Sequence, residues 1–129
     1  MFPESEKRRA RAGEDLALAF FLADRDPLWA VVALFYGLHH LLIALSLERA
    51  PEPFTPRKYS EALSLFRQAG LAKEVRKAYE KLLELSWQAR YEPLTREEGR
   101  ELWREALEAY EALREALGGA GGLPGGPGA

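Results

Sequence analysis

The sequence predicts an all-α protein, a bundle of five helices of which four are long and one is short. Residues 28–47 read LWAVVALFYGLHHLLIALSL and carry no formal charge while their histidines are neutral. The segments on either side repeat apolar residues at helical spacing, and none alternates as a strand between hairpin turns does. Because a helix that is apolar on nearly every face must be surrounded, we expect residues 28–47 to form the centre of the bundle.

This central segment is also long enough to cross a membrane, because about twenty apolar residues span a bilayer. Tyr36, His39 and His40 would then lie near the middle of the membrane, where polar groups are costly. The neighbouring helices also have wide apolar faces that need a surface to cover. We therefore expect a bundle without a membrane partner, whose central helix begins at the cap Asp26 and ends near residue 49.

The helices at either end of this segment are predicted from their end signals. The first covers residues 3–23, and the proline after Ala50 ends the central helix. Thr55 and Pro56 have the character of an N-cap and a first-turn proline, so the short helix is expected to start there. Gly70 is placed to close it in a left-handed C-cap.

The last two helices are expected at residues 71–91 and 95–117. Thr95 and Glu98 match the capping box, in which each side chain satisfies a backbone N–H of the other residue. Besides its inward positions, the final helix carries a second apolar stripe at Trp103, Leu107 and Tyr110. This extra width predicts that a second surface covers the stripe, for example that of another subunit.

One domain, residues 1–117, is expected, followed by a flexible Gly/Pro-rich tail at residues 118–129 that cannot bury enough surface to fold. The core is expected where the central helix meets the stripes of its neighbours. The residues expected to be largely buried are Leu28, Val31, Val32, Phe35, Leu38, Leu42, Leu45, Phe20, Phe66, Leu82, Leu85 and Leu113.

Composition excludes several functional classes. The absence of cysteine excludes disulfides, thiolate metal sites and a cysteine nucleophile. The 18 basic and 20 acidic residues nearly cancel, so no overall field attracts DNA. The start of the chain lacks the apolar core of a signal peptide, which favours a cytoplasmic protein. The absence of asparagine and the single methionine indicate a thermophilic source.

A group of basic residues precedes the first apolar stripe of the chain. Its members are Lys7, Arg8, Arg9 and Arg11. Most simply, these are solvated side chains on the first turns of a helix. The alternative is a phosphate-binding arm, but the segment lacks interleaved aromatic residues.

Two stretches carry a resemblance to a known family. Residues 33–40, ALFYGLHH, place an aromatic residue, Tyr36, a small residue and His40 on the central helix. Residues 82–91, LLELSWQARY, end in Arg90 and Tyr91 just before a proline. Together these stretches resemble the second and fourth helices of HEPN domains, and the similarity extends over roughly residues 15–117.

The resemblance implies an up-and-down antiparallel bundle that commonly forms a homodimer. Many members of the family are encoded beside a minimal nucleotidyltransferase and act in toxin–antitoxin pairs. Active members are metal-independent ribonucleases that use an arginine followed closely by a histidine. Others have lost this motif and bind nucleotides or protein partners.

Here the ribonuclease motif is absent. The only histidines, His39 and His40, lie in the central helix, and none follows Arg90. Lys58-Tyr59 also stands where related bacterial members often carry a His-Ser pair. No catalytic residue and no cofactor is therefore expected. Adjacent histidines project about 100° apart on a helix, so a shared metal ion is not expected either.

The candidate ligand-binding residues are Tyr36, His39, His40, Arg90 and Tyr91. In the functional interpretation, Arg90 binds phosphate while aromatic rings stack on a base. In the structural interpretation, Tyr36 and one histidine are hydrogen-bonded core groups, and Arg90 pairs with Glu92 or an acid of the last helix. Antiparallel packing does not by itself place Arg90 beside the central residues.

The leading expectation is a non-catalytic HEPN-type module that binds a nucleotide or a protein partner, such as a nucleotidyltransferase, in a toxin–antitoxin-like system. One alternative is a degenerate or unorthodox HEPN ribonuclease toxin. The other is a purely structural interaction protein without a small ligand.

Overall fold

The computed structural model describes residues 3–118, which are all-helical and contain no strand. The prediction of five helices, four long and one short, is confirmed. The helices are α1 (Pro3–Leu22), α2 (Pro27–Arg49), α3 (Tyr59–Gln68), α4 (Lys73–Tyr91) and α5 (Arg96–Ala116). Apart from its first residue, the predicted tail at residues 118–129 lies outside the described residues.

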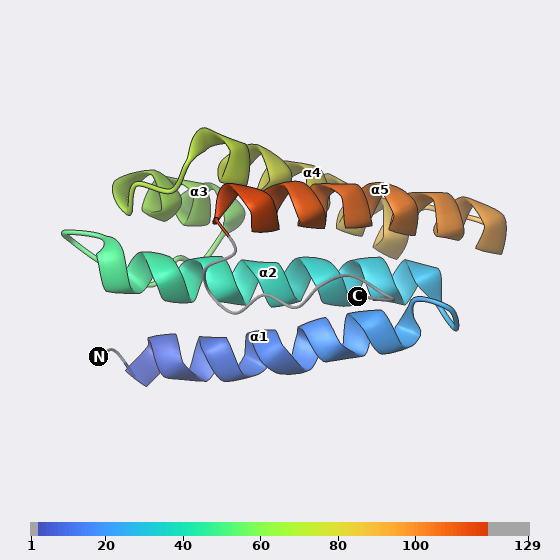
Figure 1. The fold of residues 1–129 in the computed structure, drawn as a ribbon, viewed down its shortest axis with the longest axis horizontal. Helices are drawn as coiled ribbons and strands as arrows, with labels where there is room; N and C mark the ends of the chain where they lie inside the picture. The colour runs from blue at the N-terminus through green and yellow to red at the C-terminus, as the bar shows by residue number, and fades with distance from the viewer. Residues whose placement is uncertain (1–2, 119–129) are drawn as a thin grey trace.

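Helix α2 lies between two groups of helices (Figure 1). Helix α1 packs along one side of it and runs in the opposite direction, while α3, α4 and α5 cover the other side. Helices α4 and α5 form a second antiparallel pair, and α4 also runs opposite to α2. The protein is therefore a helical bundle arranged around the segment that the sequence places at its centre.

Local signals fix both ends of α2. The Asp26 side chain accepts a hydrogen bond from the backbone N–H of Trp29 at 3.3 Å, and Pro27 occupies the first turn. At the other end, Ala50 adopts an extended conformation before Pro51. Within residues 3–118, α2 is the one helix long and apolar enough to span a membrane, and 83% of that apolar window is buried inside the bundle.

The predicted core is largely confirmed. Of the residues expected to be buried, all but two are at most 6% exposed. The exceptions, Phe20 and Leu28, are partly buried and pack against the core from the bundle's edge. Gly70 has a φ of 78° at the end of α3, and the capping box between Thr95 and Glu98 is formed, as expected.

The predicted start of the short helix is wrong, and the α5 stripe is covered by a surface of the same chain. The short helix starts at Tyr59 and not at Thr55, because the Thr55 hydroxyl donates a hydrogen bond to Glu4 at 2.6 Å. The stripe on α5 does not need a second subunit. The Phe20 ring packs edge-on against Trp103 at 6.1 Å and Tyr110 at 5.6 Å, so α1 covers the stripe within one chain.

Gly37 allows α1 to approach α2 closely. A Cβ atom built at this position would lie 2.8 Å from Leu16 Cγ and 3.2 Å from the Leu16 backbone nitrogen. Gly13 provides a contrast, because it also lies inside a helix but a Cβ there would meet no atom within 4 Å. The two glycines thus separate the intrinsic helix propensity of alanine from the cost of a steric clash.

We expect Gly37→Ala to lower the free energy of unfolding, even though alanine favours a helix by roughly 1 kcal/mol over glycine. The control, Gly13→Ala, should raise it by about 0.5–1 kcal/mol. Chemical denaturation of both variants provides the measurement. A Gly37→Ala protein as stabilised as Gly13→Ala would show that the helices do not pack this closely.

Candidate ligand-binding site

Arg90, in the last turn of α4, contacts Tyr36 in the middle of α2. Its Nη1 donates a hydrogen bond to the Tyr36 hydroxyl at 3.0 Å, and its Nε donates to the Ser86 carbonyl at 3.3 Å. The centre of the guanidinium lies 5.7 Å from the Tyr36 ring centroid and 5.1 Å from that of Tyr91. The structure therefore brings Tyr36, Arg90 and Tyr91 together, and the His39 ring also lies edge-on to Tyr36 with the centroids 6.4 Å apart.

The side chain of Arg90 reaches Tyr36 because it folds back along its own helix. Ser86 lies one turn closer to the helix N-terminus, and long helical side chains point in that direction. Within residues 3–118, Arg90 makes no ion pair, so the expected pairing with Glu92 or an acid of α5 is not found. Its positive charge is balanced by no carboxylate of the described chain.

His39 belongs to a buried aromatic cluster on the side of α2 that contacts α4. Its ring stacks on Tyr79 at 5.9 Å and on Phe35 at 5.7 Å, and its Nδ1 shares a hydrogen bond with the Tyr79 hydroxyl at 2.9 Å. Burial lowers the pKa of His39 to about 4, with further contributions from His40 and the Arg8 charge. His39 is therefore neutral at physiological pH.

His40 bonds to α1 and not to Arg90. Arg8 Nη1 lies 3.0 Å from His40 Nδ1, and because a guanidinium only donates, this nitrogen must be an unprotonated acceptor. Burial and then the Arg8 charge lower the pKa of His40. The two histidines therefore serve different neighbours. Within residues 3–118, no three histidine or acidic side chains gather in a way that could hold a metal ion.

Tyr36 links Arg90 to a second region that sequence reasoning missed. Burial, followed by the neighbouring Tyr59 hydroxyl, raises the pKa of Tyr36, while the Arg90 charge opposes this shift. Tyr59 in turn borders a hollow of about 320 Å³. The residues lining it are His39, Pro56, Arg57, Lys58 and Tyr59.

The hollow is positively charged. Arg57 and Lys58 are exposed, and neither has an ion-pair partner in the described part of the chain. The start of α3, at Lys58, has no side-chain cap, so the positive end of the helix dipole adds to these charges. One carboxylate lies nearby, because Glu61 accepts a hydrogen bond from the Arg57 backbone N–H at 2.9 Å. The two consecutive basic residues before Tyr59 were the sequence signal that could have indicated this hollow.

A second hollow, of about 360 Å³, lies between α1 and α2 on the other side of Tyr36. It is lined by Arg11, Asp15, Leu18, Trp29, Val32, Ala33, Tyr36 and His40. The only charges at its edge are paired, because Arg11 Nε lies 3.3 Å from Asp15 Oδ1. The charges of the described residues at this hollow therefore balance, unlike those beside Arg57.

The basic group at the start of α1 is mostly neutralised within the bundle. Arg8 pairs with Glu4 at 2.8 Å, and Arg9 pairs with Glu48 of α2 at 2.6 Å. With Arg11 bound to Asp15, only Lys7 lacks a carboxylate partner among the described residues. These contacts tie α1 to α2 and to itself, which gives no support to a phosphate-binding arm.

Comparison of the chain with protein-family models, with curated proteins and with solved structures found no match. The resemblance to HEPN domains therefore depends on the residues quoted above and on their arrangement in space.

The low pKa of His39 predicts that acid destabilises the protein. The unfolded chain, in which the pKa of His39 returns to about 6.5, binds a proton that the folded chain excludes down to about pH 4. The free energy of unfolding should thus fall by on the order of 2–3 kcal/mol from this group between about pH 7 and 4.5.

Urea denaturation of the wild type and of His39→Gln across this range measures the effect. Glutamine keeps a hydrogen-bonding group for Tyr79 but does not titrate, so its stability should depend less steeply on pH. Carboxylates contribute equally to both proteins and cancel in the comparison. Identical slopes would show that His39 does not remain neutral and buried.

Proposed function

We propose that this chain is a non-catalytic, nucleotide-binding module of the HEPN type that acts in the cytoplasm. The observation that carries the proposal is the position of Arg90, whose guanidinium lies 5.7 Å from the Tyr36 ring centroid and 5.1 Å from that of Tyr91 and makes no ion pair within residues 3–118. An arginine that is half-buried against aromatic rings and has no carboxylate partner is suited to bind an anion such as phosphate.

The surroundings favour a nucleotide over a single small anion. Arg57 and Lys58 add two unpaired cations at a hollow that is connected to Arg90 through Tyr59 and Tyr36, which suits a polyphosphate chain. The Tyr91 ring is 62% exposed and offers a face on which a base can stack.

The same geometry argues against nucleolytic chemistry at Arg90. An arginine remains protonated and cannot act as a general base, and neither histidine bonds to it. His39 bonds to Tyr79 and His40 bonds to Arg8. The HEPN interpretation adds a homodimer and a nucleotidyltransferase partner in a toxin–antitoxin-like pair. The exposed Leu18, Phe21 and Trp29 provide an apolar surface for such a dimer.

One observation favours the alternative of an unorthodox ribonuclease toxin. His39 borders the hollow that contains Arg57 and Lys58, so a histidine and two cations do meet at one surface. A purely structural interaction protein, the remaining alternative, requires none of these features to bind a ligand.

The Arg90→Ala variant tests the nucleotide proposal. Titration calorimetry of the wild type against a panel of nucleoside mono-, di- and triphosphates should detect binding that weakens as salt rises, because the attraction is largely ionic. Arg90→Ala should weaken it by at least about tenfold, since a hydrogen bond to a charged group contributes roughly 1.5–3 kcal/mol.

Arg104→Ala is the matched control. Arg104 lies on the exposed face of α5, where its one ion pair within residues 3–118 is with Glu101, so its removal makes the same change in charge away from the site. This variant should retain the wild-type affinity. Equal binding by Arg90→Ala and the wild type, or no nucleotide bound by the wild type, would contradict the proposed function.

We expect metal-free cleavage of RNA by the wild-type protein to remain at background. The groups that could move a proton from a ribose 2′-hydroxyl are the two histidines, and both are held in other hydrogen bonds. Incubation with a labelled single-stranded RNA in chelator is the measurement. Cleavage that disappears in His39→Gln would instead support the ribonuclease alternative.

A further inference from the structure

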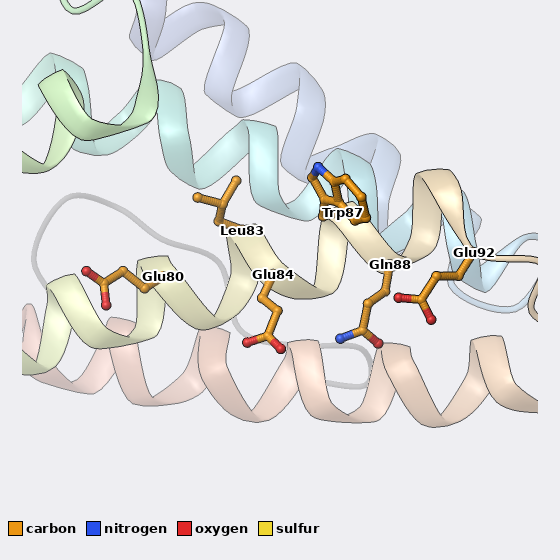
Figure 2. A pocket seen from close by; sticks show the side chains of 6 residues that line it. All are labelled: Glu80, Leu83, Glu84, Trp87, Gln88 and Glu92. Carbon is orange, nitrogen blue, oxygen red and sulfur yellow. The ribbon is translucent and has the colours of Figure 1, made fainter.

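The outer face of α4 carries two parallel ridges of opposite character. An apolar ridge is formed by Leu83, Trp87 and Tyr91, and a polar ridge by Glu80, Glu84, Gln88 and Glu92. Within each ridge the residues are four apart, which places them in a row along the helix surface. Figure 2 shows the Leu83 and Trp87 side chains on one side of the helix, with Glu84 and Gln88 on the other.

Between the two ridges lies a shallow hollow of about 400 Å³. Trp87 at its edge is 55% exposed, and its ring packs on that of Tyr91 with the centroids 4.9 Å apart. No other part of the described chain covers this aromatic pair. Large aromatic side chains bury more apolar area than most others, so an uncovered tryptophan beside a groove marks a surface suited to an interface.

The charges of the polar ridge are also uncompensated. Glu80, Glu84 and Glu92 make no ion pair within residues 3–118, although Lys81 in the same helix pairs with Glu105 at 3.4 Å. On the surface of α5 the pattern is different. There Glu97, Glu101 and Glu111 each bind the arginine three positions further along.

We propose that this face of α4 binds a basic amphipathic helix of another protein. A helix that carries Lys or Arg every four residues beside a row of Leu or Ile would place its cations against the glutamates and its apolar row in the hollow. Rows of residues four apart on both helices interdigitate in the commonest mode of helix packing. Trp87 would be the buried anchor of the interface, and its ring face also accepts a cation.

Charge excludes a second copy of this chain as the occupant. In a two-fold dimer the same patch meets itself, so a dimer centred on the hollow would set the acidic ridge against its own copy. Like charges placed opposite each other across an interface are costly. The partner is therefore a different protein of opposite charge, and its binding surface adjoins the Arg90 site at Tyr91 but does not include the hollow beside Arg57.

Binding of two labelled helical peptides of about 18 residues provides the test. One combines a row of leucine with a row of lysine, and in the other glutamate replaces every lysine. By fluorescence anisotropy the wild type should bind the basic peptide and not the acidic one. Trp87→Ala should weaken this binding by about tenfold or more, as expected of an interface anchor.

Charge reversal distinguishes this site from non-specific attraction. Glu84→Lys should weaken binding of the basic peptide, and the double variant with Glu80→Lys should prefer the acidic peptide. Glu108→Lys makes the same change in charge at an exposed position of α5 and should bind as the wild type does. Circular dichroism confirms that each variant folds, which is expected because all of these side chains are at the surface.

Three results would overturn the proposal. If Trp87→Ala or Glu84→Lys binds the basic peptide as tightly as the wild type does, the binding depends only on the overall charge of the protein. Failure of the wild type to bind it would remove the site. A wild-type dimer in sedimentation that Trp87→Ala dissociates would identify the occupant as a second copy.

Discussion

The bundle depends on one constraint, that α2 is apolar on nearly every face and must be covered all round. Four helices share this task, with α1 on one side and α3, α4 and α5 on the other. Gly37 permits the close approach of α1, and the hydroxyl of Ser5 at the start of α1 shares its one proton between Glu48 and the Ala44 carbonyl near the end of α2. The more complete this cover, the fewer polar groups α2 can leave unbonded.

That constraint also explains the candidate site. The three polar side chains in the middle of α2 each find a partner on a neighbouring helix: Tyr36 bonds to Arg90 and His39 to Tyr79, both in α4, and His40 bonds to Arg8 in α1. The contacts of His39 with Tyr79 and of His40 with Arg8 are explained by structure alone, because they satisfy hydrogen bonds of partly buried groups. The contact with Arg90 goes further, because it holds a positive charge near the surface without a carboxylate to balance it.

Much of this arrangement follows from the sequence because its signals are local. The ends of α2, the capping box at Thr95 and the left-handed turn at Gly70 are set by residues that contact their near neighbours. Thr55 misled the prediction because its hydroxyl has a choice of partners, and the distant Glu4 competes with the cap. The partner of the Trp103 stripe, Phe20, is likewise too far away in sequence to be inferred from helical periodicity.

The site itself could be predicted only in part, for a geometric reason. Helical periodicity places a Cα atom on a face, but the long Arg90 side chain bends toward the Ser86 carbonyl and its guanidinium reaches Tyr36 on another helix. Knowing which helix face each residue occupies therefore does not determine the distance from the Arg90 guanidinium to Tyr36. Arg57 and Lys58 were missed because they precede α3 in a loop, where no periodic pattern indicates the surface that they will join.

The two surfaces proposed on α4 are not independent, because Tyr91 belongs to both. Its ring packs on Trp87 on the outer face, and the guanidinium of Arg90 lies over the same ring. A helix that docks against Trp87 must therefore keep or move the ring that supports Arg90. If it moves the ring, the partner changes the affinity for nucleotide, and by thermodynamic reciprocity the nucleotide changes the affinity for the partner by the same factor. If it keeps the ring in place, it restricts Tyr91 to the conformation that already contacts Arg90, which lowers the entropic cost of ordering the site.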